Sequence, residues 1–274
     1  MSVLRVACVQ LRSGTDVAEN IEAASLLIRQ AVQDGASFVA TPEMTSLMDM
    51  RKGRLLAQAV AEADDLALAA FRALASELKL WLLIGSLPIR VADDRCANRS
   101  FFLGPDGEVR ARYDKIHMFD VEVGDGQTYR ESATFAPGDR LVVADLPWGR
   151  IGLSVCYDLR FPTLYRRLAQ AGASLILVPA AFTQTTGEAH WHVLLRARAV
   201  ETGAFVMAPA QGGRHADGRE TYGHSLVVGP WGDVRAEAGT EPGLILADLD
   251  MADVQKARSR IPAWQLERPM AVSP

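Results

Sequence analysis

Cysteine is scarce in this chain of 274 residues, which contains only Cys8, Cys96 and Cys156. Three cysteines this far apart are too few for a disulfide framework, and their spacing is not that of a zinc-ligand cluster. The sequence therefore predicts free thiols, which is typical of a reducing cytoplasmic setting.

An excess of charge of either sign is also missing. The chain has 29 Lys and Arg against 33 Asp and Glu, so its formal net charge is −4, and its basic residues are scattered. Nucleic-acid binding normally requires an extended basic face. We therefore expect no nucleic-acid partner and look for small molecules or proteins instead.

Long hydrophobic runs are absent as well. Residues 1–11 have no basic leader, no sustained apolar core and no cleavage site, and no later apolar run approaches the length of a membrane span. These features predict no export signal, no membrane partner and a cytoplasmic localisation.

The sequence has no flexible linker, low-complexity tract or short-period repeat, which predicts one domain over residues 1–274. Its composition, 49% apolar and 23% charged, is that of a soluble globular protein with a substantial core. Apolar runs alternate with helix-like stretches, and Gly35 follows the first such stretch where a helix C-cap is expected. This alternation is typical of a parallel α/β fold.

Apolar runs predict strands, and apolar residues at every third or fourth place predict helices. The expected strands are 3–11, 37–41, 80–85, 150–155, 174–179, 204–208, 225–228, 234–237 and 244–249. The expected helices are 20–34, 55–78, 162–170 and 190–202. A turn at 104–107 joins a hairpin of 100–103 and 108–113, so we expect a mixed sheet. Residues 118–138 lack periodicity and predict a long ordered loop of functional importance.

Three reactive side chains follow predicted strands. Glu43 comes after the strand at 37–41, Lys115 after the hairpin, and Cys156 closes the run that begins at Arg150. In open α/β sheets the carboxyl ends of the strands share one edge, where ligands bind. We therefore expect Glu43, Lys115 and Cys156 to converge.

The chemistry of these three residues is complementary. Cys156 can attack a carbonyl carbon, Lys115 can neutralise the resulting oxyanion, and Glu43 can transfer protons. A neighbouring ammonium and a helix beginning near Pro162 favour a thiolate, so we expect the Cys156 thiol to be more acidic than a free one.

Other interpretations remain for each residue on its own. A cysteine that ends an apolar strand is by default a core residue, as we expect for Cys8, and Cys96 lies in a polar segment typical of a loop. Glu43 and Lys115 would by default be solvated charges. A histidine-assisted cysteine hydrolase is a further alternative, although it would leave the Glu43 and Lys115 segments unexplained.

At these segments the chain resembles the carbon–nitrogen hydrolase family, or nitrilase superfamily, whose signature is a Glu–Lys–Cys set. The matching segments are Thr41-Pro-Glu43-Met, Tyr113-Asp-Lys115-Ile-His-Met-Phe-Asp120 and Gly152-Leu-Ser-Val-Cys156-Tyr-Asp-Leu-Arg-Phe-Pro162. The resemblance implies a four-layer αββα sandwich, an α/β fold. It also implies assembly into a homodimer or higher homo-oligomer, and neither a metal nor an organic cofactor.

The resemblance also implies a reaction. Cys156 attacks an amide carbon, Lys115 and the backbone N–H of Tyr157 hold the oxyanion, and Glu43 moves the protons of a two-step hydrolysis through a thioester. Glu131, in the segment 129–138, matches a second family glutamate that orients Lys115.

The second half of the chain is similar to amidases that act on deaminated glutathione and to omega-amidases of 2-oxo-dicarboxylic acid amides. We therefore expect a small carboxylate-bearing amide as substrate, with Arg160 and Thr186 as candidate contacts. Alternatives are an N-carbamoyl amidase or nitrilase activity, or a non-catalytic partner protein with the same fold. Arg160 can instead be a structural partner of Asp158 or of a helix end.

The histidines do not suggest a metal site. His190 and His192 are two residues apart on a predicted helix, so they do not share a face, and His117, His215 and His224 are each isolated in the sequence.

Overall fold

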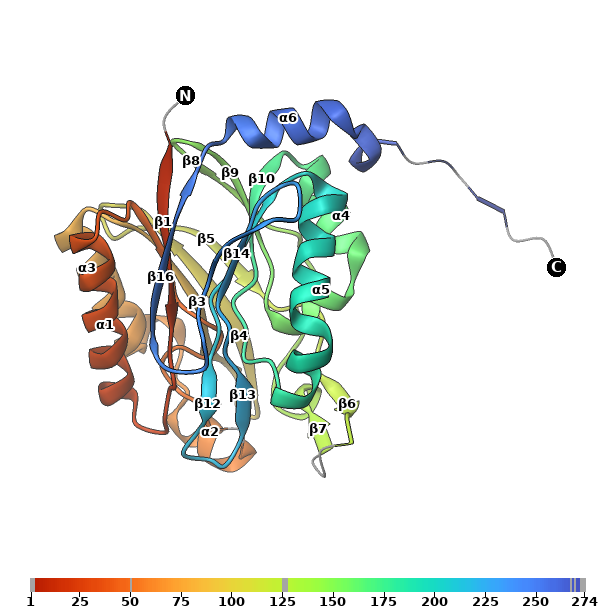
Figure 1. Ribbon diagram of the computed structural model, residues 1–274. Helices are drawn as coiled ribbons and strands as arrows, with labels where there is room; N and C mark the ends of the chain where they lie inside the picture. The colour runs from red at the N-terminus through yellow and green to blue at the C-terminus, as the bar shows by residue number, and fades with distance from the viewer. Residues whose placement is uncertain (1–2, 50, 125–127, 267, 269, 272–274) are drawn as a thin grey trace.

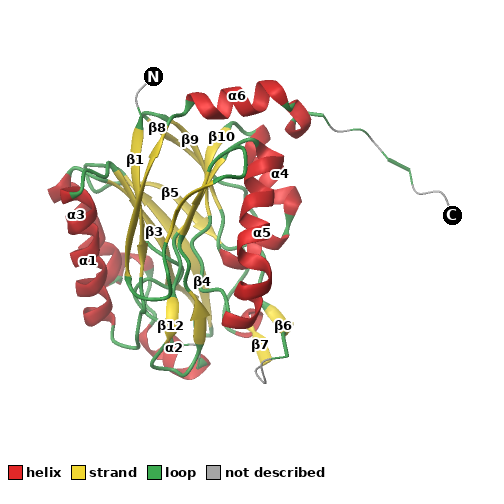
Figure 2. Cartoon of the chain, in the orientation of Figure 1, coloured by secondary structure: helices red, strands yellow, loops and turns green. Residues whose placement is uncertain are grey.

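The computed structural model describes residues 3–49, 51–124, 128–266, 268 and 270–271. Residues 125–127 of the predicted loop at 118–138 lie outside this described part. Two six-stranded sheets pack face to face, and helices cover their outer sides (Figures 1 and 2).

The first sheet has the order β16-β1-β2-β3-β4-β5. Its central strands β1, β2 and β3 run parallel, while β16, β4 and β5 are antiparallel to their neighbours, so the sheet is mixed as predicted. The strands are β1 (Leu4–Gln10), β2 (Phe38–Ala40), β3 (Trp81–Ala92), β4 (Arg95–Leu103), β5 (Val109–Asp114) and β16 (Gly243–Leu249).

The second sheet has the order β15-β14-β11-β10-β9-β8, with β9, β10 and β11 parallel. Its strands are β8 (Val143–Leu146), β9 (Gly149–Leu153), β10 (Ala173–Leu177), β11 (Phe205–Ala208), β14 (Leu226–Val228) and β15 (Val234–Glu237). Two small hairpins extend from the sheets: β6 (Asp120–Glu122) with β7 (Thr128–Arg130), and β12 (Gly212–Arg214) with β13 (Glu220–Tyr222).

The helices complete a four-layer αββα sandwich, which confirms the predicted fold class. In Figure 1, α1 and α3 cover the first sheet, α4 and α5 cover the second, and α6 crosses one end of the strands. Their bounds are α1 (Val17–Gln33), α2 (Lys52–Gln58), α3 (Leu66–Leu78), α4 (Pro162–Gln170), α5 (Gln184–Thr202) and α6 (Ala252–Arg260). Short 3-10 turns occur at η1 (Glu62–Asp64), η2 (Glu131–Ala133), η3 (Cys156–Arg160) and η4 (Pro262–Trp264).

Alternation along β1 shows how the layers are held together. Val6 and Cys8 belong to the core that contains the second sheet, whereas Ala7 and Val9 belong to the core beneath α1 and α3. Successive side chains of a strand point to opposite faces, so a strand buried on both faces is apolar throughout. This is why β1 appears in the sequence as a continuous apolar run.

The predicted helix at 55–78 is wrong in its extent. The chain forms α2, η1 and α3 there, because Asp65 accepts a hydrogen bond from Leu68 N at 2.7 Å and caps a new helix. The strand predicted at 80–85 continues to Ala92 and pairs with β4. The segment 118–138 is not an irregular loop throughout, since it contains β6, β7 and η2.

All three cysteines are free and buried. Cys8 lies in the core, as predicted, but the prediction that Cys96 is a loop residue is wrong, because it is fully buried in β4. Among the described residues, no helix combines the length and the apolarity needed to cross a lipid bilayer. That residues 1–274 form a single domain stays a prediction.

Candidate active site

Glu43 is held in place by a close backbone crossing. The turn after β2 passes so near β3 that a Cβ atom on Gly85 would lie 2.1 Å from the carbonyl oxygen of Thr41. Only glycine fits at such a distance. The crossing directs the Glu43 side chain inward, where 4% of the residue is exposed.

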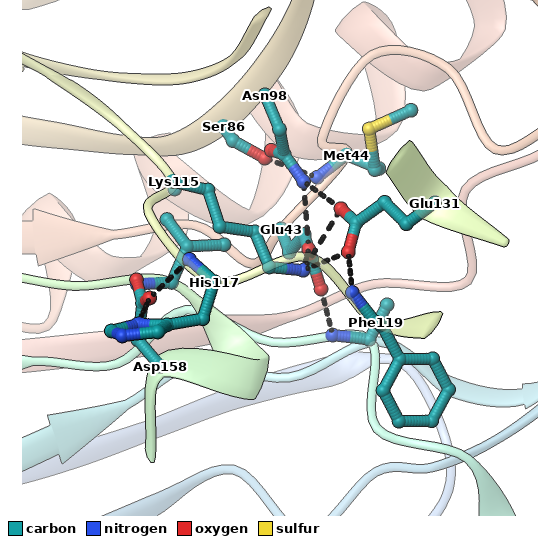
Figure 3. A network of polar contacts seen from close by, with 12 residues as sticks. Glu43, Met44, Ser86, Asn98, Lys115, His117, Phe119, Glu131 and Asp158 are labelled. Atoms are coloured by element: carbon teal, nitrogen blue, oxygen red, sulfur yellow. Dashed lines mark hydrogen bonds and ion pairs between the residues drawn. The ribbon is translucent and has the colours of Figure 1, made fainter. Parts of the chain in front are cut away.

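Lys115 lies between two carboxyl groups, as Figure 3 shows. Its Nζ atom is 2.9 Å from Oε1 of Glu43 and 2.9 Å from both carboxyl oxygens of Glu131. The amide of Asn98 donates to Glu43 at 2.8 Å and to Glu131 at 3.2 Å. Four buried polar side chains thus form one network in which Lys115 is shared.

The segment after β5 fixes the backbone around Lys115 and Glu131. Gly138 N donates to the carbonyl of Lys115 at 2.8 Å, and a Cβ on Gly138 would fall 2.2 Å from Asp114 O. Phe119 N donates to Oε2 of Glu131 at 2.6 Å. The segment therefore folds back over the lysine and brings the second glutamate to it.

Cys156 lies just beyond β9 with a strained backbone. Its φ angle is 50°, in the left-handed region that residues other than glycine rarely adopt. Its N–H donates to Pro179 O at 2.9 Å, which ties the turn to the end of β10. Its thiol forms a hydrogen bond with the Glu43 carboxylate, and Oε2 of that carboxylate accepts from Ala181 N at 2.8 Å.

Asp158 anchors the turn that carries Cys156. Its fully buried carboxylate accepts hydrogen bonds from Tyr113 OH at 2.6 Å and from Val155 N at 2.9 Å. It also accepts from His117 N at 3.0 Å and lies 2.7 Å from His117 Nδ1. These contacts connect the cysteine turn to β5 and to the segment that follows Lys115.

The buried groups of the network shift one another's pKa values. Burial raises the pKa of the Cys156 thiol well above its ordinary value, and the neighbouring Glu43 carboxylate raises it further, although Lys115 lowers it. For Glu43, burial is outweighed by Lys115, so its pKa lies below the ordinary value. For Lys115, burial is outweighed by Glu131 and Glu43, so its pKa lies well above the ordinary value. At neutral pH, therefore, a neutral thiol faces an ionised carboxylate.

A pocket opens over these groups. Its empty volume is about 830 Å³, part of which is open to solvent, so it is large enough for a small-molecule substrate. The backbone N–H of Tyr157 faces no acceptor within the described part of the chain. The lining includes Glu43, Asn98, Lys115, Tyr129, Arg130, Glu131, Cys156, Tyr157, Phe182, Thr183, Thr186 and Arg219.

Comparison with known sequences identifies the family. The model of the carbon–nitrogen hydrolase family matches residues 5–259. The chain belongs to the carbon–nitrogen hydrolase family. A protein of Synechocystis named deaminated glutathione amidase is 40% identical over 264 residues, which cover 94% of this chain and 96% of the relative. Human omega-amidase NIT2 is 34% identical over 268 residues, which cover 98% and 96%.

Solved structures support the same assignment for this carbon–nitrogen hydrolase. The NitFhit protein of C. elegans superposes with a TM-score of 0.91 at 34% identity, covering 98% of this chain and 66% of that one. An amidase from Nesterenkonia, with a TM-score of 0.80 and 30% identity, covers 96% and 100%. That structure is of a mutant with glutamine in place of one glutamate, and it shows acrylamide added to the active-site cysteine.

The structure brings together six of the residues predicted for this hydrolase. They all line the pocket: Glu43, Lys115, Glu131, Cys156, Tyr157 and Thr186. Thr186 lies in the first turn of α5, which begins at Gln184 and not near His190 as predicted.

Arg160 is not among the lining residues. Its guanidinium lies 3.3 Å from Nδ1 of His190 and stacks over the rings of Phe182 and Tyr157, both of which line the pocket. The alternative that Arg160 pairs with Asp158 is wrong, because that carboxylate is used by the cysteine turn. Arg160 as a substrate contact stays a prediction.

The expectation of an acidic thiol is wrong in the resting enzyme. The sequence places Lys115 near Cys156, but it does not reveal that two carboxylates neutralise the lysine or that the thiol is buried. Burial and the negative charge of Glu43 outweigh the ammonium.

Sequence analysis missed three residues of the site. Asn98 lies within β4, Asp158 serves the cysteine turn, and Arg219 reaches the pocket from the connection between β12 and β13. The spacing of a motif does not reveal contacts of this kind, because each depends on strand register or on a distant hairpin. Asp158 carried a signal, since it lies two residues after the predicted nucleophile.

Proposed function

We propose that this carbon–nitrogen hydrolase is a cysteine-dependent amidase that converts a small carboxylate-bearing amide to the acid and ammonia. The observation that carries the proposal is the contact of the Cys156 thiol with Glu43 while Glu43 is paired with Lys115 in one pocket. The names of the relatives, deaminated glutathione amidase and omega-amidase, support amide hydrolysis.

The first half of the reaction forms a thioester. The Cys156 sulfur attacks the amide carbon while its proton passes to Glu43, and Lys115 Nζ and the Tyr157 N–H stabilise the oxyanion. When the tetrahedral intermediate collapses, the C–N bond breaks and Glu43 returns the proton to the departing nitrogen. Ammonia leaves and the acyl group stays on sulfur.

The second half regenerates the enzyme. Glu43 takes a proton from a water molecule as its oxygen attacks the thioester carbon, and the same oxyanion donors act again. Cleavage of the C–S bond releases the acid, and the proton on Glu43 returns to the thiolate. The low pKa of Glu43 and the high pKa of Cys156 agree with this order of reaction steps, because the base is ionised and the thiol is protonated before substrate binds.

Two arginines are the candidate partners of the substrate carboxylate. Arg219 lines the pocket beside the ring of Tyr129, and Arg160 stacks on the ring of Phe182. Neither guanidinium forms an ion pair within the described residues. The other arginine of the pocket lining, Arg130, is already paired with Glu122 at 3.0 Å.

The proposal is tested by a substrate panel. We expect ammonia release from deaminated glutathione or 2-oxoglutaramate, and the KM for that substrate should rise in Arg219→Gln or Arg160→Gln with little change in kcat. Arg130→Gln is the matched control and should leave KM nearly unchanged. If the enzyme hydrolyses only an N-carbamoyl amine or a nitrile, the proposed substrate class is wrong. No turnover of any of these compounds would favour a non-catalytic partner protein.

We also propose that the enzyme is a cytoplasmic homodimer. The three free cysteines support a reducing environment. Val193, Val200 and Trp231 are 60%, 55% and 55% exposed. Val193 and Val200 are seven residues apart on α5, and the turn at Gly232 meets Val200. An apolar surface of this kind is suited to a second copy of the chain.

A further inference from the structure

The histidines that are isolated in the sequence are not isolated in the structure. His192 on α5, His224 between β13 and β14, and Glu237 at the end of β15 place their ligand atoms within 4.8 Å of one another. Among the described residues, theirs is the one group of this kind, and it lies outside the pocket lining. The sequence-based prediction rejected a site made from His190 and His192 and treated His224 as isolated, and it therefore missed this group.

The contacts within the group converge on a single oxygen. Nε2 of His192 and Nδ1 of His224 are each 2.9 Å from Oε1 of Glu237. Around a four-coordinate zinc ion with bonds of about 2.0–2.1 Å, neighbouring ligand atoms are separated by about 3.3 Å. The two nitrogen–oxygen distances would therefore lengthen by a few tenths of an ångström when an ion enters. The side chains are 34%, 25% and 38% exposed, so the group is open to solvent.

The backbone holds His224 toward this group. Its φ angle is 52°, in the left-handed region. The conformation is fixed on both sides, because His224 N donates to Gly239 O at 2.9 Å and the indole of Trp191 donates to His224 O at 2.8 Å. The ring of Tyr222 stacks on the imidazole with centroids 4.3 Å apart. Ligands that are pre-oriented by surrounding contacts are a feature of metal sites.

We propose that His192, His224 and Glu237 bind a divalent transition-metal ion of the zinc type, with water in the remaining position. Two imidazoles and one carboxylate favour such an ion over Mg²⁺ or Ca²⁺, which prefer oxygen ligands. The ion would link α5, the connection between β13 and β14, and β15, so its binding should stabilise the contacts among these elements. The proposal does not depend on the identity of the amide substrate.

The test is a Zn²⁺ titration of the chelator-treated chain, followed by competition with a chromogenic chelator and by thermal unfolding. We expect one ion per chain and a higher Tm with zinc. Binding should weaken at least about tenfold in both His192→Gln and Glu237→Gln. Glu188→Gln changes an exposed carboxylate on the same helix and should bind as tightly as the unmodified chain.

Cys156 is the competing ligand, because a thiolate also binds zinc. Retention of the ion in Cys156→Ala supports the proposed site. Loss of the ion in Cys156→Ala, unchanged binding in both His192→Gln and Glu237→Gln, or no binding by the unmodified chain would each overturn it. A spectrum of the unmodified chain with added Co²⁺ tests the proposal without any variant. A strong near-ultraviolet thiolate band would contradict the proposal, whereas weak visible bands alone would support it.

Discussion

Cys156 combines a strained backbone with a buried, protonated thiol. Its left-handed φ is maintained by the bond to Pro179 and by the anchored carboxylate of Asp158. Strain of this kind persists where the surrounding structure enforces it, and it is common at reactive sites. At Cys156 the strained backbone brings the sulfur to Glu43 and leaves the N–H of Tyr157 free to bind an oxyanion. The nucleophile depends on a neighbouring base and not on an unusually acidic thiol.

Replacing Lys115 tests the oxyanion role. In Lys115→Gln one donor loses its charge, so we expect kcat to fall about 10²- to 10³-fold, equivalent to roughly 2.7–4 kcal/mol. Single-turnover kinetics measures the loss, and circular dichroism checks the fold. Lys52→Gln, an exposed lysine on α2, is the control and should leave kcat unchanged. A decrease of less than tenfold in Lys115→Gln would argue against the role.

The pH profile of kcat/KM tests the protonation states. Glu43 must be ionised, and its pKa lies below its ordinary 4.5, so the acid limb should fall below that pH. Cys156 starts protonated, and its pKa lies well above 9.0, while Lys115 keeps its charge beyond 10.5, so the alkaline limb should lie above pH 9.0. We expect a plateau between these limits. A limb near pH 6–7 would instead indicate a histidine base.

At the scale of elements, the cysteine turn is held to β5 by Asp158. In Asp158→Asn the buried donors of Tyr113, Val155 and His117 compete for a weaker acceptor. We expect a loss on the order of 3 kcal/mol in the free energy of unfolding, together with a lower kcat. Urea unfolding and steady-state kinetics measure the two effects.

Tyr113→Phe is the matched control for the cysteine turn, because it removes one of those hydrogen bonds and leaves the carboxylate in place. It should cost about 1 kcal/mol and leave kcat nearly unchanged. Equal losses of stability in Tyr113→Phe and Asp158→Asn would show that Asp158 does not anchor the turn.

The elements also show what could be predicted from sequence. The rule that parallel strands end at one edge accounts for Glu43 and Lys115, which follow strands of the same sheet, but it does not cover Cys156, which follows a strand of the second sheet. The break between α2 and α3 was missed because apolar spacing continues across it, although Asp65 is a recognisable N-cap residue. The contribution of Asn98 could not be predicted, since it depends on the register of β4 against β5 and on the fold of the segment after Lys115.

At the scale of the molecule, the site lies at the edge of both sheets. Glu43 and Lys115 follow strands of the first sheet, whereas Cys156 follows a strand of the second. The packing of the sheets therefore decides whether the proton-transfer group Glu43, the oxyanion donor Lys115 and the nucleophile Cys156 meet. The pairing of two distant sheets depends on the whole hydrophobic core, which is why the family resemblance and not local pattern predicted the αββα architecture.

The proposed dimer is tested at the same scale. Val200→Glu places a charge within the exposed apolar surface of α5, and we expect the mass measured by light scattering to change from that of a dimer to that of a monomer. Leu26→Glu is the control, because Leu26 is 70% exposed on α1, on the opposite outer layer. A monomeric unmodified chain, or a dimer that persists in Val200→Glu, would contradict the proposed surface.

The most direct measurement is mass spectrometry of Glu43→Gln incubated with the amide substrate. Without its carboxylate the variant lacks the base for both halves of the reaction, so the thioester should form slowly. Because water is also not activated, the thioester should persist once formed and add the acyl mass to the peptide that contains Cys156. Cys156→Ala should show no adduct. An adduct on Cys8 or Cys96, or normal turnover by Glu43→Gln without any adduct, would contradict the assignment of nucleophile and base.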